Sequence, residues 1–226
     1  MAELEAVLFD LDGLLADTEE LHVTAYEAVG GYLDIDLDRV YICSFIGGPT
    51  RENIKRVMRD YAVPMDRFDE ILKVRYDSYM AVIRSTPLEP MYGALDCILD
   101  VKERAFKSAL VTSSIREHAL AVLDNISQHA DHGRDIAALF DAMVFGDELE
   151  HLKPAPDIYI EALQRLTTVA ERGVALEDSA FGVLSAKRAG LRVIAVPGPH
   201  TEGQDFSMAD AVASSLAEVV ERRLIA

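Results

Sequence analysis

The sequence predicts an α/β fold, in which a parallel β-sheet carries helices on both faces and a small helical unit is inserted into it. Short apolar segments typical of buried strands recur along the chain, and amphipathic helical patterns separate them. The first two segments lie much further apart than one crossover helix requires, which predicts the insert. The 226 residues, half of them hydrophobic, are enough for one large domain or for a core with an insert.

Five apolar segments are expected to form the strands. Each is short and consists of Ala, Val, Leu, Ile, Met or Phe without a charged residue. Strands of this kind are typical of a parallel sheet that is buried on both faces, as in the doubly wound, Rossmann-like class. The expected strands lie at residues 6–9, 109–111, 142–145, 174–176 and 193–196.

The interval after the first strand reads as helical. Residues from about 18 to 83 show helical periodicity without a convincing strand. One helix is expected to begin at Thr50, and a second to run over residues 67–83 and end before Pro87. We therefore divide the chain into a Rossmann-like catalytic core, residues 1–16 and 86–226, and a helical insert, residues 17–85.

The second half of the chain contains further helical patterns. Helices are expected at 157–166 and 180–189, and Gly190 follows the latter as a C-cap. Residues 125–135 are polar and include His129 and His132. They lack a third ligand at a suitable spacing for a metal, so we interpret them as a solvated loop, with helix resuming toward Phe140.

Composition narrows the function classes. The formal net charge of −17 argues against nucleic acid or an anionic membrane as a partner, since both are polyanions. The two cysteines, Cys43 and Cys97, are too few for a four-ligand zinc site and are expected to be buried free thiols. No signal peptide and no stretch able to span a bilayer is evident, so we expect a cytoplasmic protein.

Two acids follow the first expected strand directly. Asp10 and Asp12 are two residues apart, so on an extended chain both carboxylates can face the same reactant. Gly13 then permits a tight turn and the close approach of a ligand to the backbone. Such a pair of acids suggests a nucleophile, an acid/base or a metal site.

Polar residues also follow the other expected strands. They are residues 112–114 after the second strand, Lys153 some way after the third, and residues 177–179 at the end of the fourth. Helix capping, an ordinary surface lysine and a helix N-terminus would each explain one of these features separately. Because ligands bind outside the carboxyl ends of the strands in an open parallel sheet, their joint occurrence predicts one crevice.

Four segments carry a family resemblance: DLDGLLADTE, VTSS, LKPAPDIY and LEDSAFGVLSA. They resemble the four motifs of haloacid dehalogenase-superfamily phosphotransferases, in the subgroup of β-phosphoglucomutases and sugar-phosphate phosphatases. The resemblance spans nearly the whole chain and implies a Rossmann-like core with a small inserted helical cap domain, which the helical insert matches.

The resemblance implies a two-step phosphoryl transfer. Asp10 would be the nucleophile and form an aspartyl-phosphate. Asp12 would protonate the departing alkoxide and then take a proton from the acceptor as it attacks. The cofactor would be Mg²⁺, held by Asp10, the backbone carbonyl of Asp12, and Asp178, with Glu177 acting through metal-bound water. Lys153 would add a fixed positive charge beside the nucleophile.

Further residues are implied for the phosphate and the rest of the substrate. Thr112, with nearby backbone amides, would cradle the phosphate. In the cap, His22 of DTEELH would position the acid/base, Arg51 of GGPTREN would contact the substrate, and Arg75 falls where the mutases carry a lysine. The other expected substrate-binding residues are Gly13, Ser113, Ser114 and Arg116.

The favoured activity is a Mg²⁺-dependent phosphatase acting on a small phosphorylated sugar, as a monomer. The alternative is a β-phosphoglucomutase-type mutase, which must hold two phosphates. After Ser114, relatives that hold the distal phosphate carry Lys then Asn, whereas Ile115 and Arg116 stand here, which favours hydrolysis. The cap arginines suggest a second anionic group on the substrate.

A third hypothesis is a non-catalytic binding protein on the same fold. It predicts the loss of at least one of the residues that the chemistry needs. Asp10, Asp12, Lys153 and Asp178 are all present, which argues against it.

Overall fold

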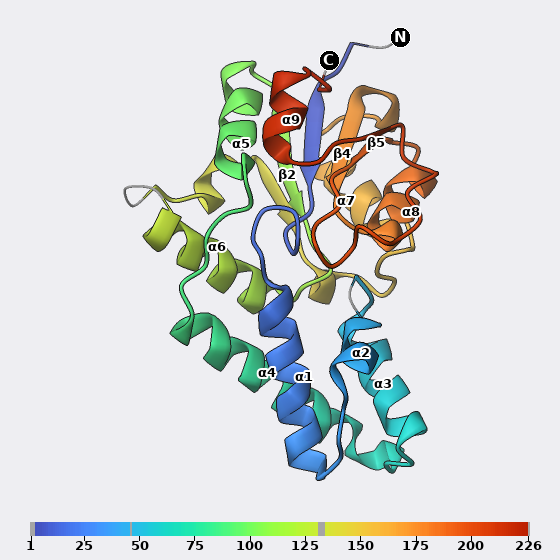
Figure 1. Cartoon of the computed structure of the whole chain (residues 1–226). Coiled ribbons are helices and arrows are strands. Elements are labelled where there is room, and N and C mark those ends of the chain that lie inside the picture. Colours follow the sequence, from blue (N-terminus) through green and yellow to red (C-terminus); the bar gives the residue numbers. More distant parts are fainter. Residues whose placement is uncertain (1–2, 46, 131–133, 226) are drawn as a thin grey trace.

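The computed structural model describes residues 3–45, 47–130 and 134–225. Its centre is a six-stranded sheet in the order β3-β2-β1-β4-β5-β6, in which every neighbouring pair is parallel (Figure 1). The strands are β1 Ala6–Phe9, β2 Lys107–Val111, β3 Ala142–Val144, β4 Gly173–Glu177, β5 Arg192–Ala195 and β6 Ala211–Val212. The five expected strands are confirmed. The sequence did not predict β6, a partly exposed pair of residues too short to show a strand pattern.

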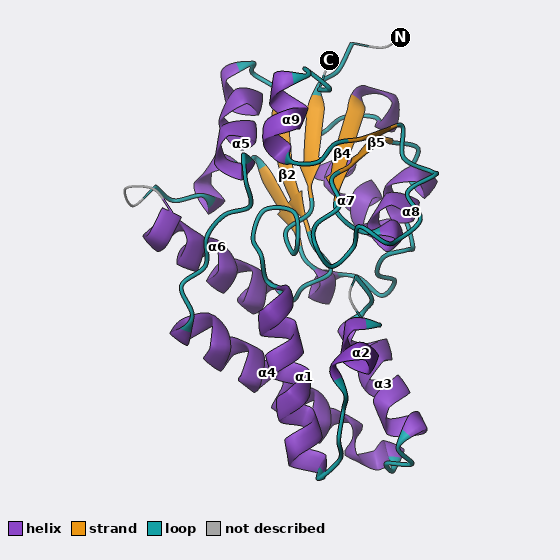
Figure 2. Ribbon diagram, in the orientation of Figure 1, coloured by secondary structure: helices purple, strands orange, loops and turns teal. Residues whose placement is uncertain are grey.

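Helices cover both faces of the sheet, as Figure 2 shows. The alternation of side chains along β1 illustrates why: Val7 and Phe9 belong to one apolar cluster, whereas Ala6 and Leu8 belong to another. The first cluster includes residues of α5 Ala94–Glu103, α6 Arg116–Ala130 and α9 Leu216–Glu221, and the second includes residues of α7 Asp157–Arg165 and α8 Ala180–Arg188. The doubly wound α/β class is thereby confirmed.

The helical insert (residues 17–85) lies beyond the carboxyl ends of the strands (Figure 1). It has an apolar cluster of its own, to which Ile54, Val57 and Met58 contribute from one face. The boundaries of the core and the insert stay predictions. The helices of this segment are α1 Glu19–Leu33, α2 Arg39–Cys43, α3 Thr50–Asp60 and α4 Phe68–Ser85.

The prediction of a loop over residues 125–135 is wrong for the first part of that segment. Helix α6 continues to residue 130, because the apolar stripe that includes Val122 and Ile126 packs into the core. His129 lies on this helix, and His132 lies outside the described residues. Instead of a resumed α-helix before Phe140, a single 3₁₀ turn forms.

Asn125, which the sequence placed in that loop, is buried and ties α6 to the linker that leaves the helical insert. Its side-chain carbonyl accepts from the Leu88 amide at 2.9 Å. Its side-chain amide donates to the carbonyls of Ile83 at 2.7 Å and Thr86 at 2.8 Å. This linker is therefore fixed to the core at one point.

Other expectations concern single residues and the membrane. Gly190 follows α8 with φ of +85°, as expected of a residue just past a helix end. Both cysteines are free; Cys97 is buried, whereas Cys43 is only half-buried. Among the described residues, no helix combines the length and apolarity that crossing a membrane requires.

Candidate active site

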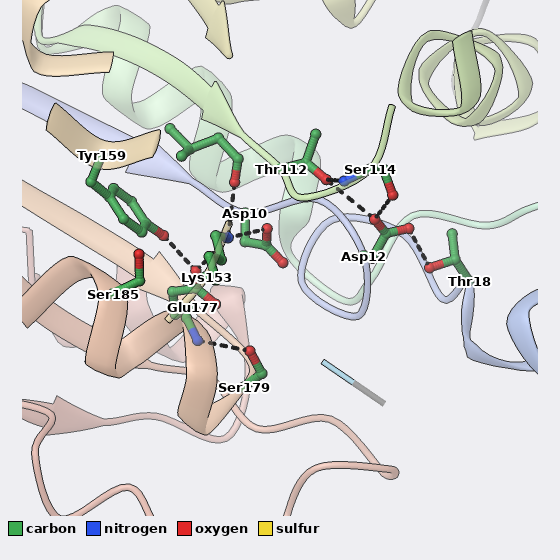
Figure 3. Close-up of polar contacts among 12 residues, drawn as sticks. Asp10, Asp12, Thr18, Thr112, Ser114, Lys153, Tyr159, Glu177, Ser179 and Ser185 are labelled. Carbon is green, nitrogen blue, oxygen red and sulfur yellow. Dashed lines mark hydrogen bonds and ion pairs between the residues drawn. The ribbon is translucent and has the colours of Figure 1, made fainter. Parts of the chain in front are cut away.

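Asp10 lies where β1 ends, next to the point where the strand order reverses. Its amide donates to the carbonyl of Leu176 in β4, which fixes the backbone, and its side chain is buried. The Nζ of Lys153 donates to Asp10 Oδ1 at 2.6 Å, to Glu177 Oε1 at 2.6 Å and to the Val111 carbonyl at 3.0 Å (Figure 3). One ammonium group therefore joins the carboxyl ends of β1, β2 and β4.

Burial sets the electrostatics of this group. Burial raises the pKa of Asp10 to about 7, although the charge of Lys153 opposes the rise. Burial alone would lower the pKa of Lys153, but the carboxylates of Asp10 and Glu177 outweigh it and raise that pKa. The lysine therefore stays an ammonium. Burial, with Asp10 and Glu177 nearby, raises the pKa of Asp178 well above its ordinary value.

The buried acids have the composition of a cation site. Carboxylate oxygens of Asp10, Glu177 and Asp178 all lie within 4.8 Å of one another. Only Lys153 forms ion pairs with them in the described part of the chain, so buried carboxyl groups outnumber buried cations. Oxygen ligands suit a hard divalent cation, and such a cation would stabilise these carboxyl groups in their ionised form. These residues fit such an ion.

Gly13 allows Asp178 to approach the loop after β1. Its φ is +79°, and a Cβ atom there would stand 2.3 Å from Asp178 Oδ2. Any larger residue would displace that carboxylate. The lack of a side chain at Gly13 therefore allows Asp178 to keep its place in the acidic cluster.

Asp12 faces a different set of groups from Asp10 (Figure 3). Its Oδ1 accepts from Thr18 at 2.7 Å, and its Oδ2 accepts from Ser114 at 2.7 Å and Thr112 at 3.3 Å. Burial alone would raise the pKa of Asp12, but hydrogen bonds from His22, Ser114 and Thr18 hold it well below its usual range. In this arrangement Asp12 is ionised and ready to accept a proton.

His22 and Arg75 come from the helical insert and meet beside Asp12. His22 Nε2 lies 3.5 Å from Asp12 Oδ1, and its ring stacks on Tyr79 at 4.4 Å. Arg75 contacts His22 Nδ1, and because a guanidinium only donates, the histidine proton is on Nε2. Burial, with Arg75 nearby, lowers the pKa of His22, so the imidazole is neutral.

A pocket of about 730 Å³, its mouth included, connects these groups with the helical insert. Residues that follow β2 line its sheet end, where the Ser114 amide donates to Thr112 Oγ1 at 3.0 Å. The sequence-predicted residues that line it are Asp10, Asp12, His22, Arg75, Thr112, Ser113, Ser114, Lys153 and Asp178.

Arg51 and Arg116 do not line this pocket. Arg51 is exposed, with its guanidinium 4.8 Å from the ring centre of Phe68. Arg116 is exposed, pairs with Glu148 and lies 4.3 Å from the ring centre of Phe145. Their roles in substrate binding stay predictions.

The structure adds residues that the sequence did not single out as site residues. Tyr159 donates to Glu177 Oε1 and so helps to hold that carboxylate. Tyr79 lies 3.4 Å from Asp12 Oδ1, and its spacing of four from Arg75 was a signal that both share a helix face. Glu19, adjacent to Thr18, also lines the pocket, and no sequence pattern distinguished it from its exposed neighbour Glu20.

The fold and the site together define a class: an α/β enzyme with an acidic site at the carboxyl ends of a doubly wound parallel sheet, facing a helical insert. The sequence profile of haloacid dehalogenase-like hydrolases matches residues 7–196. The chain belongs to this family, and the resemblance seen in the sequence is confirmed.

Two relatives and one solved structure show where the chain lies within the family. Protein CbbY of Cereibacter sphaeroides is 34% identical over 224 residues, 96% of this chain and 94% of that protein. A phosphorylated carbohydrates phosphatase of Thermotoga maritima is 35% identical over 215 residues, 93% of each protein. The crystal structure of a CbbY mutant from Rhodobacter sphaeroides in complex with xylulose-(1,5)bisphosphate is 31% identical, with a TM-score of 0.81 over 96% of each chain.

Proposed function

We propose that this protein is a Mg²⁺-dependent phosphatase that hydrolyses a small sugar phosphate through an aspartyl-phosphate on Asp10. The observation that carries the proposal is the buried Asp10 carboxylate, 2.6 Å from Lys153 Nζ and open to a pocket that Asp12 shares. The charge of Lys153 favours the ionised form of Asp10 and is available where a phosphoryl group would arrive.

In the first step, an Asp10 carboxylate oxygen attacks phosphorus as the bond from phosphorus to the sugar oxygen breaks. The negative charge of the bound phosphate ester would raise the pKa of Asp12, so that Asp12 takes up a proton and gives it to the departing alkoxide. Lys153 and the hydroxyl of Thr112 offset the charge on the phosphoryl oxygens. The products of this step are the free sugar hydroxyl and a phosphorylated Asp10.

In the second step, water attacks phosphorus and the bond to Asp10 breaks. The ionised Asp12, which Thr18 and Ser114 hold in place, takes the proton from that water. Inorganic phosphate leaves, Asp10 is a carboxylate again, and Asp12 carries the proton that the next leaving group needs.

Asp10, Asp178 and the backbone carbonyl of Asp12 would hold Mg²⁺, with Glu177 acting through water. The buried excess of carboxylates over lysine supports this assignment. When bound there, the ion would supply positive charge that offsets repulsion between Asp10 and the phosphate.

The sugar phosphate class is supported by the relatives and by Arg75. One relative is named a phosphorylated carbohydrates phosphatase, and a CbbY structure contains xylulose-(1,5)bisphosphate. Arg75 is 1% exposed and lines the pocket; within the described residues it forms no ion pair with a carboxylate, and its Nε has no hydrogen-bond partner. A second anionic group on the substrate would supply that partner.

Phosphate release with Mg²⁺ from a panel of sugar mono- and bisphosphates tests the proposal. The panel includes xylulose 1,5-bisphosphate and β-glucose 1-phosphate, and glucose 6-phosphate formation is followed in the same tubes. We expect phosphate release from one or a few sugars and none from Asp10→Asn. Glucose 6-phosphate with little free phosphate would support the mutase alternative, which the pairing of Arg116 with Glu148 disfavours.

A further inference from the structure

Helices α4 and α6 join the helical insert to the core at two places. At one, the side chain of Asn125 on α6 donates to the carbonyl of Ile83 in α4 at 2.7 Å. At the other, the His118 ring on α6 lies 5.0 Å from that of Tyr76 and 4.9 Å from that of Tyr79, both on α4. His118 and Asn125 are about 10 Å apart along their helix. Because Asn125 fixes the end of α4, the insert can turn away from the core about that point once the contact of His118 is broken.

The contact at His118 accommodates a neutral imidazole and disfavours a charged one. His118 is 3% exposed, and its Nε2 is buried without a hydrogen-bond partner among the described residues. Protonation makes both ring nitrogens donors, so the charged ring needs an acceptor at Nε2 that the contact does not supply. Burial of a charge without a partner destabilises the arrangement that buries it.

The groups that surround His118 do not compensate a charge on its ring. Burial lowers the pKa of His118 to about 4, and the charges of Arg75 and His22 add to this effect. The charge of Asp12 and the backbone of Tyr76 favour the protonated form but do not outweigh burial. The carboxylates in the groove that His118 also lines are exposed, so water screens them. The charged and titratable groups that face His118 are Arg75, Tyr76 and Tyr79 of α4, His22 of α1, Asp12 after β1 and, in the groove, Asp69, Lys73, Asp77 and Arg84 of α4 and Glu117 of α6.

We propose that the neutral imidazole of His118 is a pH-sensitive latch that holds the helical insert closed on the core, and that protonation of this ring opens the two apart. In the open form His118 would face water, which solvates its charge. The groove between α4 and α6 is open to solvent and gives a proton a route to the ring. Opening would also withdraw Tyr79, which lies 3.4 Å from Asp12 Oδ1.

The difference in proton affinity between the two forms sets the size of the effect. The pKa of His118 is about 4 in the closed form and would return to its ordinary value of 6.5 in the open form. The closed form therefore has its full advantage above pH 6.5 and loses it as the pH falls toward 4. From pH 7 to pH 5, the ratio of open to closed molecules should rise by about 20-fold.

Single-molecule fluorescence energy transfer in the full chain, without substrate, measures this ratio. One dye is attached at Asp66→Cys, between α3 and α4 of the insert, and the other at Glu171→Cys, in the turn before β4. Both positions are exposed. A Cys43→Ser background removes the half-buried thiol, and the remaining Cys97 is buried.

Two matched substitutions on α6 separate the latch from other effects of pH. His118→Phe keeps an aromatic ring between the tyrosines of α4 and cannot be protonated. His129→Phe is the control, because His129 lies on the same helix, is exposed and contacts the carbonyl of Asn125 within that helix. We expect the wild type and His129→Phe to show the 20-fold rise, and the ratio in His118→Phe to change by less than about threefold.

An equal rise in the wild type and His118→Phe, or a ratio in the wild type that does not change with pH, would overturn the inference. If His118→Phe failed to fold, His118→Leu, which is also neutral at every pH, would replace it, and the same two outcomes would decide. Since the measurement needs no substrate, a failure of the proposed phosphatase activity would leave it unaffected.

Discussion

At the scale of single residues, burial determines how much an ion pair of this protein contributes to stability. Lys153 and Lys55 each have a carboxylate oxygen at 2.6 Å, from Asp10 and from Glu52 respectively. The Lys153 side chain is 5% exposed and the Lys55 side chain 43%. Water and salt screen the second pair and hardly reach the first. The same distance therefore has different consequences at the two sites.

Lys153→Met should lower the free energy of unfolding by about 3 kcal/mol, since it leaves Asp10 and Glu177 buried without a cation. Activity should fall by about 10²–10³-fold with the loss of charge at the phosphoryl group. Lys55→Met, as the control, should change stability by less than about 1 kcal/mol. Urea denaturation and phosphate release measure both effects; equal stability changes in the two variants would contradict the assignment.

Binding of Mg²⁺ at the proposed site should be visible in stability as well as in activity. Mg²⁺ at about 100 times its Kd should stabilise the wild type by about 2.7 kcal/mol, and EDTA should reverse the effect. Asp178→Asn should abolish this response, whereas Asp66→Asn, at an exposed position, should keep it. Thermal denaturation with and without Mg²⁺ measures this effect. A wild-type Tm that does not change with Mg²⁺ would contradict the proposed metal site.

At the scale of elements, the contact between α4 and α6 joins the helical insert to the core. His118 of α6 is 3% exposed, and its ring lies 5.0 Å from that of Tyr76 and 4.9 Å from that of Tyr79, both on α4. Burial, with Arg75 nearby, lowers the pKa of His118 to about 4. A neutral imidazole therefore lies in the contact, and protonation would place an uncompensated charge there.

This contact predicts a pH dependence of stability. Since the pKa of His118 is lower in the folded chain than the unfolded value of about 6.5, its contribution is complete above that value and is lost as pH falls toward 4. Between pH 7 and pH 5 the wild type should lose about 2 kcal/mol more of its unfolding free energy than His118→Phe. Urea denaturation at both pH values measures this; parallel losses would exclude the histidine as the cause.

At the scale of the whole molecule, the sequence sufficed for five of the six strands of the sheet and for the convergence of polar residues at one edge. Apolar strands predict a parallel sheet, and parallel strands place Asp10, Thr112 and Glu177 at the same side. The orientation of long exposed side chains could not be read in this way. Arg51 lies against Phe68, and Arg116 pairs with Glu148, through contacts that only the folded chain creates.

Predictions from the local sequence pattern fail where the burial of a residue depends on segments that are distant in the chain. Asn125 appears as a loop residue in sequence, yet it is buried because the end of α4 and the linker that follows it pass beside α6. Glu19 and Glu20 look equivalent in sequence, and only the folding of α1 against the pocket separates them. The elements follow from local sequence patterns and the reaction class from the resemblance of four motifs to a family, whereas substrate contacts follow from packing.

In the proposed reaction, Asp10 carries the phosphoryl group between substrate and water. The most direct measurement is a rapid acid quench during turnover of the best substrate, followed by mass spectrometry of the peptides. We predict one phosphoryl group on Asp10 that hydroxylamine removes and that Asp10→Asn lacks. Full turnover with no phosphorylated Asp10 at any quench time, or a phosphoryl group on another residue, would contradict the account.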